Sequence, residues 1–205
     1  MDRYVGFYWT LPVPFGDFTA LPADVEGAAA RSRTVRYQRE RVRRWVKDEH
    51  GRLVAERAFL ELAPDRGTVT VTAEIDAIVA LARDEGASLV LVDFAESFGW
   101  RKHPALWERL EELGAPYVAL PPDPVIIDGA EFDPIAHFRM WADIWDAFRK
   151  SKPERKASIR AAIGDLPVAE MTNAEIARAL NDAGIKSLGG KDWTKDNVAK
   201  FIKSA

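Results

Sequence analysis

Residues 87–94 have the sequence ASLVLVDF, a nearly continuous apolar run that ends in an aspartate and a phenylalanine. The run lacks the alternation of apolar and polar residues expected of a strand with one solvated face. It is typical of a parallel strand that helices cover on both sides. The stretch therefore predicts an α/β fold in which this strand lies in the centre of the sheet.

Strand and helix patterns alternate on both sides of this run. Short aromatic and β-branched stretches predict strands, and apolar residues at helical spacing predict helices. The predicted elements are a strand at 4–9, a helix at 32–48, a strand at 53–62, a helix at 71–83, the strand at 87–94, a helix at 104–113 and a strand at 117–120. This order predicts a mostly parallel sheet with flanking helices and right-handed crossovers.

Prolines after residue 120 end the alternation, and Asp133-Pro134 has the pattern of a helix N-cap followed by proline in the first turn. The helix that follows has one strongly apolar face, which consists of Ile135, Phe138, Trp141, Ile144, Trp145 and Phe148. Pro153 is expected to break or kink this helix inside a basic connector. We expect three parts: an α/β domain at 1–133, the long helix and connector at 134–167, and a small all-α domain at 168–205.

Composition restricts the possible functions. The 205 residues are 47% hydrophobic, which is enough for a folded core, and they include no cysteine and three scattered histidines, so we expect no disulfide, metal or cofactor. The N-terminus does not have the pattern of a signal peptide, and no apolar run approaches the length of a membrane span. We expect a cytoplasmic protein that does not bind membranes.

Positive charge is concentrated at the C-terminal end. Residues 149–205 hold 12 Lys and Arg against 7 Asp and Glu, whereas residues 1–148 hold 17 against 25. Phosphate attraction is screened within roughly 10 Å in physiological salt, so local basicity matters more than net charge for binding nucleic acid. A net charge of -3 is therefore compatible with a nucleic-acid-binding module at the C-terminus.

Two helices are predicted in the C-terminal part. Thr172 and Glu175 have the spacing of a capping box, and residues 181–184 (NDAG) form a stop signal that tolerates a left-handed conformation. After the Gly189-Gly190 turn, a second helix is expected to begin at Trp193-Thr194. The two helices share a small apolar core.

The segment 171–202, MTNAEIARALNDAGIKSLGGKDWTKDNVAKFI, resembles the DNA-binding region of serine recombinases. The pattern of that region is EIA-x-x-LN-x-x-GI, a glycine-rich segment, and W-[ST]-x-x-x-V-x-x-I. The resemblance implies a helix-turn-helix that binds double-stranded DNA, and hence a protein associated with the nucleoid. In such a motif the start of the second helix enters the major groove.

We therefore expect DNA contacts at the start of this helix and just before it, from Lys191, Thr194, Lys195, Asp196, Asn197 and Lys200. Asn197 is the best candidate for a base-edge contact, and the lysines would mainly contact phosphates. The alternative is a small helical cap whose lysines and asparagine are simply solvated.

The rest of the chain resembles the catalytic domain of the same family through residues 34–54 (TVRYQRERVRRWVKDEHGRLV), which are similar to the family's Q-x-x-x-[IL]-x-x-[YW] helix and following strand, and through LVLVDFAESFGWR at 89–101. The resemblance implies a resolvase-like fold. In the family a serine after the first strand attacks a DNA phosphate, and nearby arginines neutralise the developing charge.

The catalytic positions of the family fall on unsuitable residues in this chain. The resemblance places the serine on Leu11 and the first arginine on Trp9, and it places the second pair of arginines on Ser97 and Trp100. Arg101 is one residue out of register. We therefore expect no recombinase activity.

Other interpretations of this region stay open. An active enzyme with a rearranged site would use Thr10 or another hydroxyl together with Arg101. Asp93 and Glu96, with His103 close by in sequence, are either a catalytic carboxylate pair or solvated acids at a strand end. The two tryptophans at arginine positions either fill the former pocket with aromatic core or form a pocket that stacks a ligand.

Two surfaces allow two interpretations each. The basic run of Arg31, Arg33, Arg36, Arg39, Arg41, Arg43 and Arg44 is either a solvated helix face or a contact to the DNA backbone. The apolar face of the helix after residue 134 packs on its own sheet or pairs with a second copy about a twofold axis. We favour a homodimer, because a twofold dimer would place two recognition helices on a palindromic site.

The leading hypothesis is a catalytically inactive, serine-recombinase-like protein that binds specific DNA as a dimer, as a transcriptional regulator or a mobile-element accessory factor. One alternative is an active site-specific recombinase. Another is an adaptor whose N-terminal domain binds a protein or small ligand and whose C-terminal part brings it to DNA.

Overall fold

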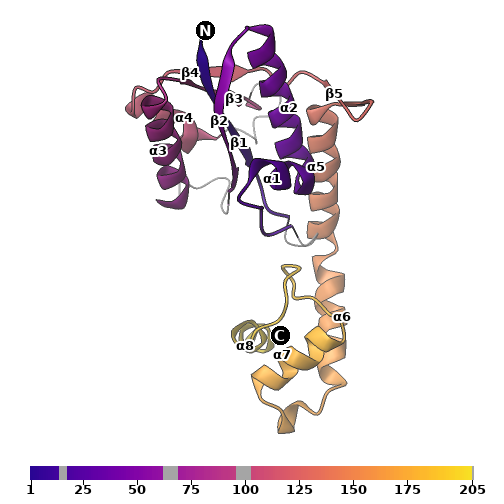
Figure 1. Ribbon diagram of the computed structural model, residues 1–205. Helices are drawn as coiled ribbons and strands as arrows, with labels where there is room; N and C mark the ends of the chain where they lie inside the picture. The colour runs from indigo at the N-terminus through magenta and orange to yellow at the C-terminus, as the bar shows by residue number, and fades with distance from the viewer. Residues whose placement is uncertain (14–17, 62–68, 96–102, 205) are drawn as a thin grey trace. The chain divides into compact units, whose positions relative to one another are not determined.

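The structure is a computed structural model that describes residues 1–13, 18–61, 69–95 and 103–204 (Figure 1). The chain divides into two compact units. The first unit consists of Met1–Pro12 and Ala20–Arg139, and the second of Val13–Thr19 and Met140–Ala205. Each unit is described by itself below.

The first unit contains a four-stranded sheet in the order β2-β1-β3-β4, with every neighbouring pair parallel. The strands are β1 (Arg3–Thr10), β2 (Arg52–Leu60), β3 (Ser88–Val92) and β4 (Tyr117–Leu120). β3 lies between β1 and β4, and four of its five residues are buried. The prediction of a central parallel strand from residues 87–94 is confirmed.

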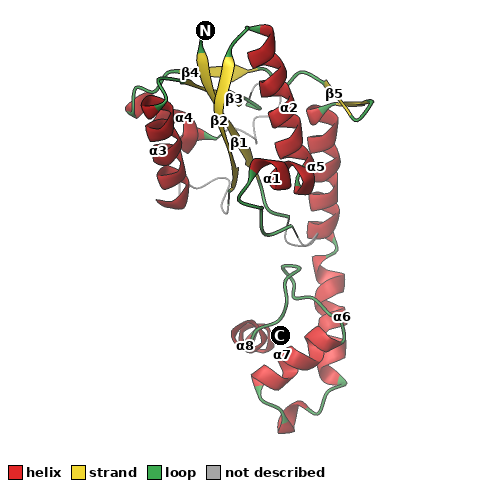
Figure 2. Ribbon diagram, viewed as in Figure 1, coloured by secondary structure: helices red, strands yellow, loops and turns green. Residues whose placement is uncertain are grey.

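Helices cover both faces of this sheet (Figure 2). α1 (Val25–Arg31) and α2 (Arg33–Asp48) pack on one face, and α3 (Val69–Asp84) and α4 (Pro104–Glu112) pack on the other. Side chains of β1 alternate between the two cores, with Tyr4 and Tyr8 in the first and Val5 and Phe7 in the second. This alternation follows from the two-residue period of a strand. The α/β class with a mostly parallel sheet is therefore confirmed.

Two features of the first unit were not predicted. α1 begins at Asp24, whose carboxylate accepts from the N–H of Gly27 at 2.7 Å, and it ends where Ser32 caps α2. A hairpin of β5 (Val125–Ile127) and β6 (Ala130–Phe132) follows β4. Its turn is Asp128-Gly129, and both residues have positive φ. Asp-Gly between apolar residues is a strong hairpin signal, so the sequence carried this information.

The long helix α5 (Pro134–Lys150) begins as predicted. Oδ1 of Asp133 accepts from the N–H of Ile135 at 2.7 Å and from that of Ala136 at 3.2 Å, which is an N-cap. Within its first turns, Phe138 is 2% exposed and packs edge to face on Phe94 with ring centroids 5.0 Å apart. The start of α5 is thus part of the core of the first unit.

The second unit is helical. After α5 ends at Lys150, α6 (Lys152–Gly164) begins with Pro153 in its first turn, so the predicted interruption near Pro153 is confirmed. A short 3-10 helix (Val168–Glu170), α7 (Asn173–Asp182) and α8 (Lys195–Lys203) follow. Among the residues that the structure describes, no helix is long and apolar enough to cross a membrane.

A side-chain amide completes the hydrogen bonding of β1. The register with β3 runs only from Tyr4 to Gly6, so the backbone of Trp9 lies beyond the paired segment. Gln38, which is 0% exposed on α2, accepts from the N–H of Trp9 at 3.2 Å and donates to its carbonyl at 2.7 Å. It also donates to the carbonyl of Thr34 at 3.1 Å. Gln38 thereby takes the place of a neighbouring strand and joins α2 to the end of β1.

We expect Gln38→Leu to lower the free energy of unfolding by about 2–4 kcal/mol, because it leaves the buried N–H and carbonyl of Trp9 without partners. Urea denaturation followed by circular dichroism measures the change. Arg44→Leu is the control, since Arg44 is exposed on the same helix and such surface changes shift stability by about 0.5 kcal/mol or less. Equal effects of the two variants would contradict the role given to Gln38.

Candidate nucleic-acid interface

Three helices build the core of the second unit. Its buried apolar residues are Ile159, Ile176, Ala177, Leu180, Trp193, Val198 and Phe201. Ile159 belongs to α6, and Ala162, Ile163 and Leu166 pack against the same cluster. The residues expected to be only a connector therefore form the first helix of this core, together with α7 and α8.

Both C-terminal helices begin with a capping box. The hydroxyl of Thr172 accepts from the N–H of Glu175 at 3.3 Å, and the Glu175 carboxylate accepts from the N–H of Thr172 at 2.7 Å. The hydrogen bonds from Thr172 hold the pKa of Glu175 below its usual range. A carboxylate whose pKa is lowered by folding stabilises the folded state at pH values above that pKa. The cap therefore weakens as the pH falls through the pKa of Glu175 in the folded protein. The start of α7 is thus fixed as predicted.

The same arrangement at α8 involves Asn197, the residue predicted to contact a base edge. The hydroxyl of Thr194 accepts from the N–H of Asn197 at 3.3 Å, and Oδ1 of Asn197 accepts from the N–H of Thr194 at 2.8 Å. Its amide nitrogen donates to the carbonyl of Asp192 at 3.4 Å. To contact a base edge, the side chain of Asn197 would have to break these hydrogen bonds and form new ones to the base.

The other predicted contact residues lie on the surface just before and along α8, with Lys200 in the last turn of the helix. Lys191, Thr194, Lys195, Asp196 and Lys200 are all exposed. Val198 and Phe201 on the same helix are buried against α7, so one face of α8 is fixed and the lysines lie outside it. This arrangement gives a basic surface at a helix N-terminus, where N–H groups also attract anions.

Asn181 is the residue that sequence reasoning undervalued, because it was considered only as part of a helix stop. Its Oδ1 accepts from the N–H of Trp193 at 2.8 Å, and its amide nitrogen donates to the carbonyl of Trp193 at 3.0 Å. The side chain therefore ties the end of α7 to the residue just before α8. Its place in the LN-x-x-GI pattern was the only sequence signal for this role.

The connection between α7 and α8 contains a closed turn. The N–H of Ser187 donates to the carbonyl of Lys191, and the N–H of Gly190 donates to the carbonyl of Ser187, both at 2.8 Å. Gly190 has a φ of +77°, a conformation that glycine adopts without strain. Lys186 forms an ion pair with Asp192 at 2.8 Å across this turn. Residues 186–191, which we call the connecting turn, thus have a defined shape.

The arginine-rich face of α2 is largely paired within the first unit. Arg41 contacts Asp123 at 2.8 Å, and Arg43 contacts Glu26 at 2.7 Å and Glu56 at 2.6 Å. Arg36 and Arg39 also contact carboxylates, those of Asp128, Glu26 and Glu40. These pairs neutralise much of the positive charge, which favours a structural surface over a DNA contact for this helix face.

The positions that the resemblance assigns to catalytic residues of serine recombinases are only partly described. Trp9 is 4% exposed and packs edge to face on His103 and Phe94. Thr10 is buried and its hydroxyl accepts from that of Ser32 at 3.4 Å, whereas Leu11 is half-buried. Glu96, Ser97, Trp100 and Arg101, to which the sequence analysis gave possible roles, lie outside the described residues.

A buried Glu61–His103 pair lies beside Trp9. The Nε2 atom of His103 lies 3.1 Å from the Glu61 carboxylate, and its Nδ1 atom accepts from the N–H of Leu106 at 3.2 Å. Glu61 is 1% exposed and His103 5%. Because its Nδ1 atom accepts from the N–H of Leu106 in the first turn of α4, His103 is the N-cap of that helix. Sequence reasoning considered His103 only beside Asp93 and missed Glu61.

The predicted dimer face of α5 is not uniform. Phe138 is buried inside the first unit, as expected if this part of the helix packs on its own sheet. Ile135 is half-buried. Further along, Trp141 and Phe148 are half-buried, whereas Ile144 and Trp145 are 37% and 38% exposed. Only the later part of the face is thus accessible to a partner.

Comparison of the chain with protein-family models, curated proteins and solved structures finds no match. Within the described part of the chain, no three His, Asp or Glu residues form a group that could hold a metal ion.

Proposed function

We propose that this protein binds specific DNA sequences through α7 and α8 as a helix-turn-helix, and that it acts as a transcriptional regulator or a mobile-element accessory factor. The single observation that carries the proposal is the set of exposed lysines just before and along α8, a helix with a capped start whose opposite face is buried against α7. The resemblance of residues 171–202 to the DNA-binding region of serine recombinases supports it.

In this proposal α8 is the recognition helix. Lys195 and Lys200 contact phosphates on either side of the groove, and Lys191 does so from the connecting turn. Asn181 and the Thr194–Asn197 cap hold the first turn of α8 in place, so that little conformational freedom is lost on binding. Base selection then falls to exposed side chains of this turn and to DNA shape.

We expect Lys195→Gln and Lys200→Gln each to weaken DNA binding and to lower the slope of log affinity against log salt by about 0.9, the value for one lost phosphate contact. Fluorescence anisotropy with duplexes that the wild-type protein selects from a random-sequence pool measures both quantities.

The control for these variants is Lys47→Gln, which removes the same charge from an exposed position on α2 in the first unit. It should leave affinity and slope unchanged. A wild-type protein that enriches no sequence from the pool, or lysine variants that bind like the control, would refute the proposed recognition helix.

We further propose that the first unit has no strand-cleaving activity. Leu11 occupies the position of the family's nucleophilic serine, and the nearest hydroxyl, that of Thr10, is buried and bonded to Ser32. Trp9 occupies an arginine position and is buried among aromatic rings. These residues provide neither an accessible nucleophile nor a positive charge to stabilise a phosphorane.

Detergent denaturation of the wild-type protein after incubation with supercoiled DNA that carries its selected sites should yield no covalent protein–DNA adduct. Labelled DNA that migrates with the protein in a denaturing gel would instead establish the alternative function of an active recombinase. The variant Thr10→Val would then test whether that hydroxyl is the nucleophile.

We propose a homodimer in which the later part of α5 pairs with the same segment of a second copy. Met140, Ile144 and Trp145 expose 46%, 37% and 38% of their surface on this helix. Apolar residues grouped on one helix favour a twofold contact, because the same patch then covers itself on both subunits. Such a dimer would place two recognition helices on a palindromic site.

Ile144→Glu should raise the dissociation constant of the dimer about a hundredfold or more, because an unpaired carboxylate would be buried in an apolar contact. Sedimentation equilibrium measures it. Ala157→Glu adds the same charge at an exposed position of α6 and should leave the dimer intact. A monomeric wild-type protein would rule the dimer out.

A further inference from the structure

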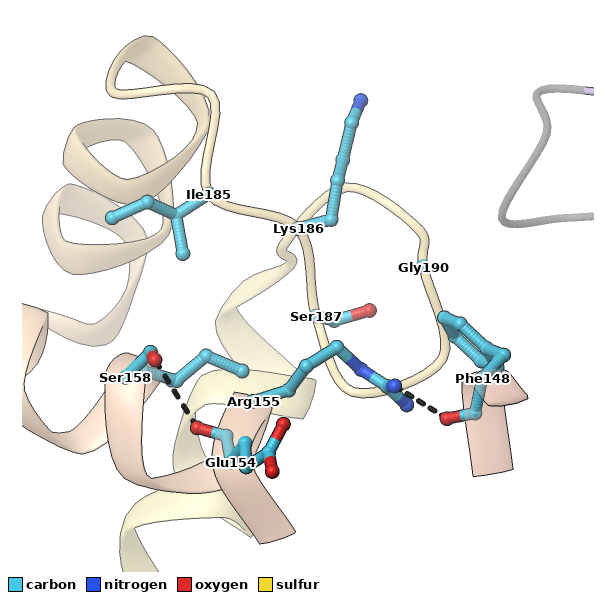
Figure 3. A pocket seen from close by; sticks show the side chains of 9 residues that line it. Phe148, Glu154, Arg155, Ser158, Ile185, Lys186, Ser187 and Gly190 are labelled. Atoms are coloured by element: carbon cyan, nitrogen blue, oxygen red, sulfur yellow. Dashed lines mark hydrogen bonds between the residues drawn. The ribbon is translucent and has the colours of Figure 1, made fainter. Parts of the chain in front are cut away.

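Arg155 on α6 connects three segments of the second unit. Its guanidinium donates to the carbonyl of Phe148 at the end of α5, to the hydroxyl of Ser151, and to the carbonyl of Leu188 in the connecting turn at 3.3 Å. It also lies over the ring of Phe148, 3.7 Å from the centroid. Figure 3 shows the side chain directed toward Phe148, beside the turn that carries Ser187 and Gly190.

The bond to Phe148 has a local cause. The last carbonyls of a helix lack partners within the helix. At the end of α5, the carbonyl of Phe148 accepts instead from the hydroxyl of Ser151 and from Arg155. A cation at this place also complements the negative end of the helix dipole. Arg155 therefore acts as the C-terminal cap of α5.

The partners of Arg155 are all neutral. No carboxylate of a described residue lies within ion-pair distance of it, so the planar guanidinium is held by two carbonyls, a hydroxyl and an aromatic face. Several donors in a fixed plane are required to reach such acceptors together, which a lysine does not offer. The geometry of Arg155 thus suits a fixed bridge better than a mobile surface charge.

The bridge ends on the connecting turn, which holds its shape by its own hydrogen bonds. The contact of Arg155 with Leu188 attaches that turn to α6, and Leu188 also packs against the core of the unit. The side chain of Lys186 points away from Arg155 (Figure 3), and Lys191 lies at the other end of the turn. Arg155 thereby contacts the turn that carries these two lysines.

We propose that Arg155 is a positioning residue that couples the C-terminal end of α5 to the DNA contacts of the connecting turn. It touches no DNA itself and acts by placing Lys191. For its DNA readout this inference rests on the proposed function. Since α5 carries the proposed dimer contact, a displacement of the end of α5 on dimer formation would be passed to the connecting turn through the side chain of Arg155.

The first test requires no DNA. Arg155→Gln should speed cleavage by a lysine-specific protease after Lys186 and Lys191 about tenfold, the effect of losing a hydrogen bond to a charged group. Cleavage after Lys200, inside α8, should stay slow if the change is local. Arg160→Gln is the control, because it removes the same charge from an exposed position of α6. Arg155→Lys should behave like Arg155→Gln.

The second test is a double-mutant cycle on DNA affinity. Arg155→Gln and Lys191→Gln should each weaken binding to selected duplexes, and the double variant should lose less than the product of the two fold-changes, because both act on one contact. Its salt slope should match that of Lys191→Gln alone. Additive losses would mean that Arg155 contacts phosphate directly and would overturn the inference.

The two proposals fail in different ways. If the wild-type protein binds no DNA but Arg155→Gln exposes the turn to protease, the proposed function falls and the positioning role stands. If the wild-type protein selects DNA while Arg155→Gln matches Arg160→Gln in both cleavage and affinity, the positioning role falls and the proposed function stands.

Discussion

A buried backbone N–H or carbonyl must have a partner, and in both units a side-chain amide supplies one where regular structure ends. Gln38 pairs with both backbone groups of Trp9 at the end of β1, and Asn181 pairs with both groups of Trp193 before α8. Each amide offers a donor and an acceptor in one plane, which matches the two groups of a peptide edge. The four hydrogen bonds of these two side chains join α2 to the end of β1 and α7 to the residue before α8.

Charge is distributed in the two units by different means. In the first unit, acids outnumber bases, and the arginines of α2 are drawn into ion pairs with Glu26, Glu56 and Asp123. In the second unit, Lys191, Lys195 and Lys200 are exposed just before and along α8. Paired guanidinium groups project little field beyond their partners, whereas exposed lysines at a helix N-terminus attract anions. The densest basic run in the sequence is therefore not the surface that we propose to bind DNA.

In the second unit, α6 contacts both the helix that carries the proposed dimer contact and the segments proposed to bind DNA. Ile159 packs this helix on α7 and α8, while Arg155 links it to the end of α5 and to the connecting turn. A helix that was expected only to connect two domains thus shares the core of the proposed DNA-binding module. A boundary at residue 168 would separate Ile159 from the cluster that it completes.

The sequence by itself determined the elements whose cause is local. Apolar periodicity located the four parallel strands and their helices, and capping signals at Asp133 and Thr172 located helix starts, because these depend on neighbours within a few residues. Only the tertiary structure decided which long-range partners those residues have. It paired the arginines of α2, buried Glu61 beside His103, and brought Arg155 to Leu188. Such contacts depend on how distant segments pack, and a single sequence holds no local signal for that.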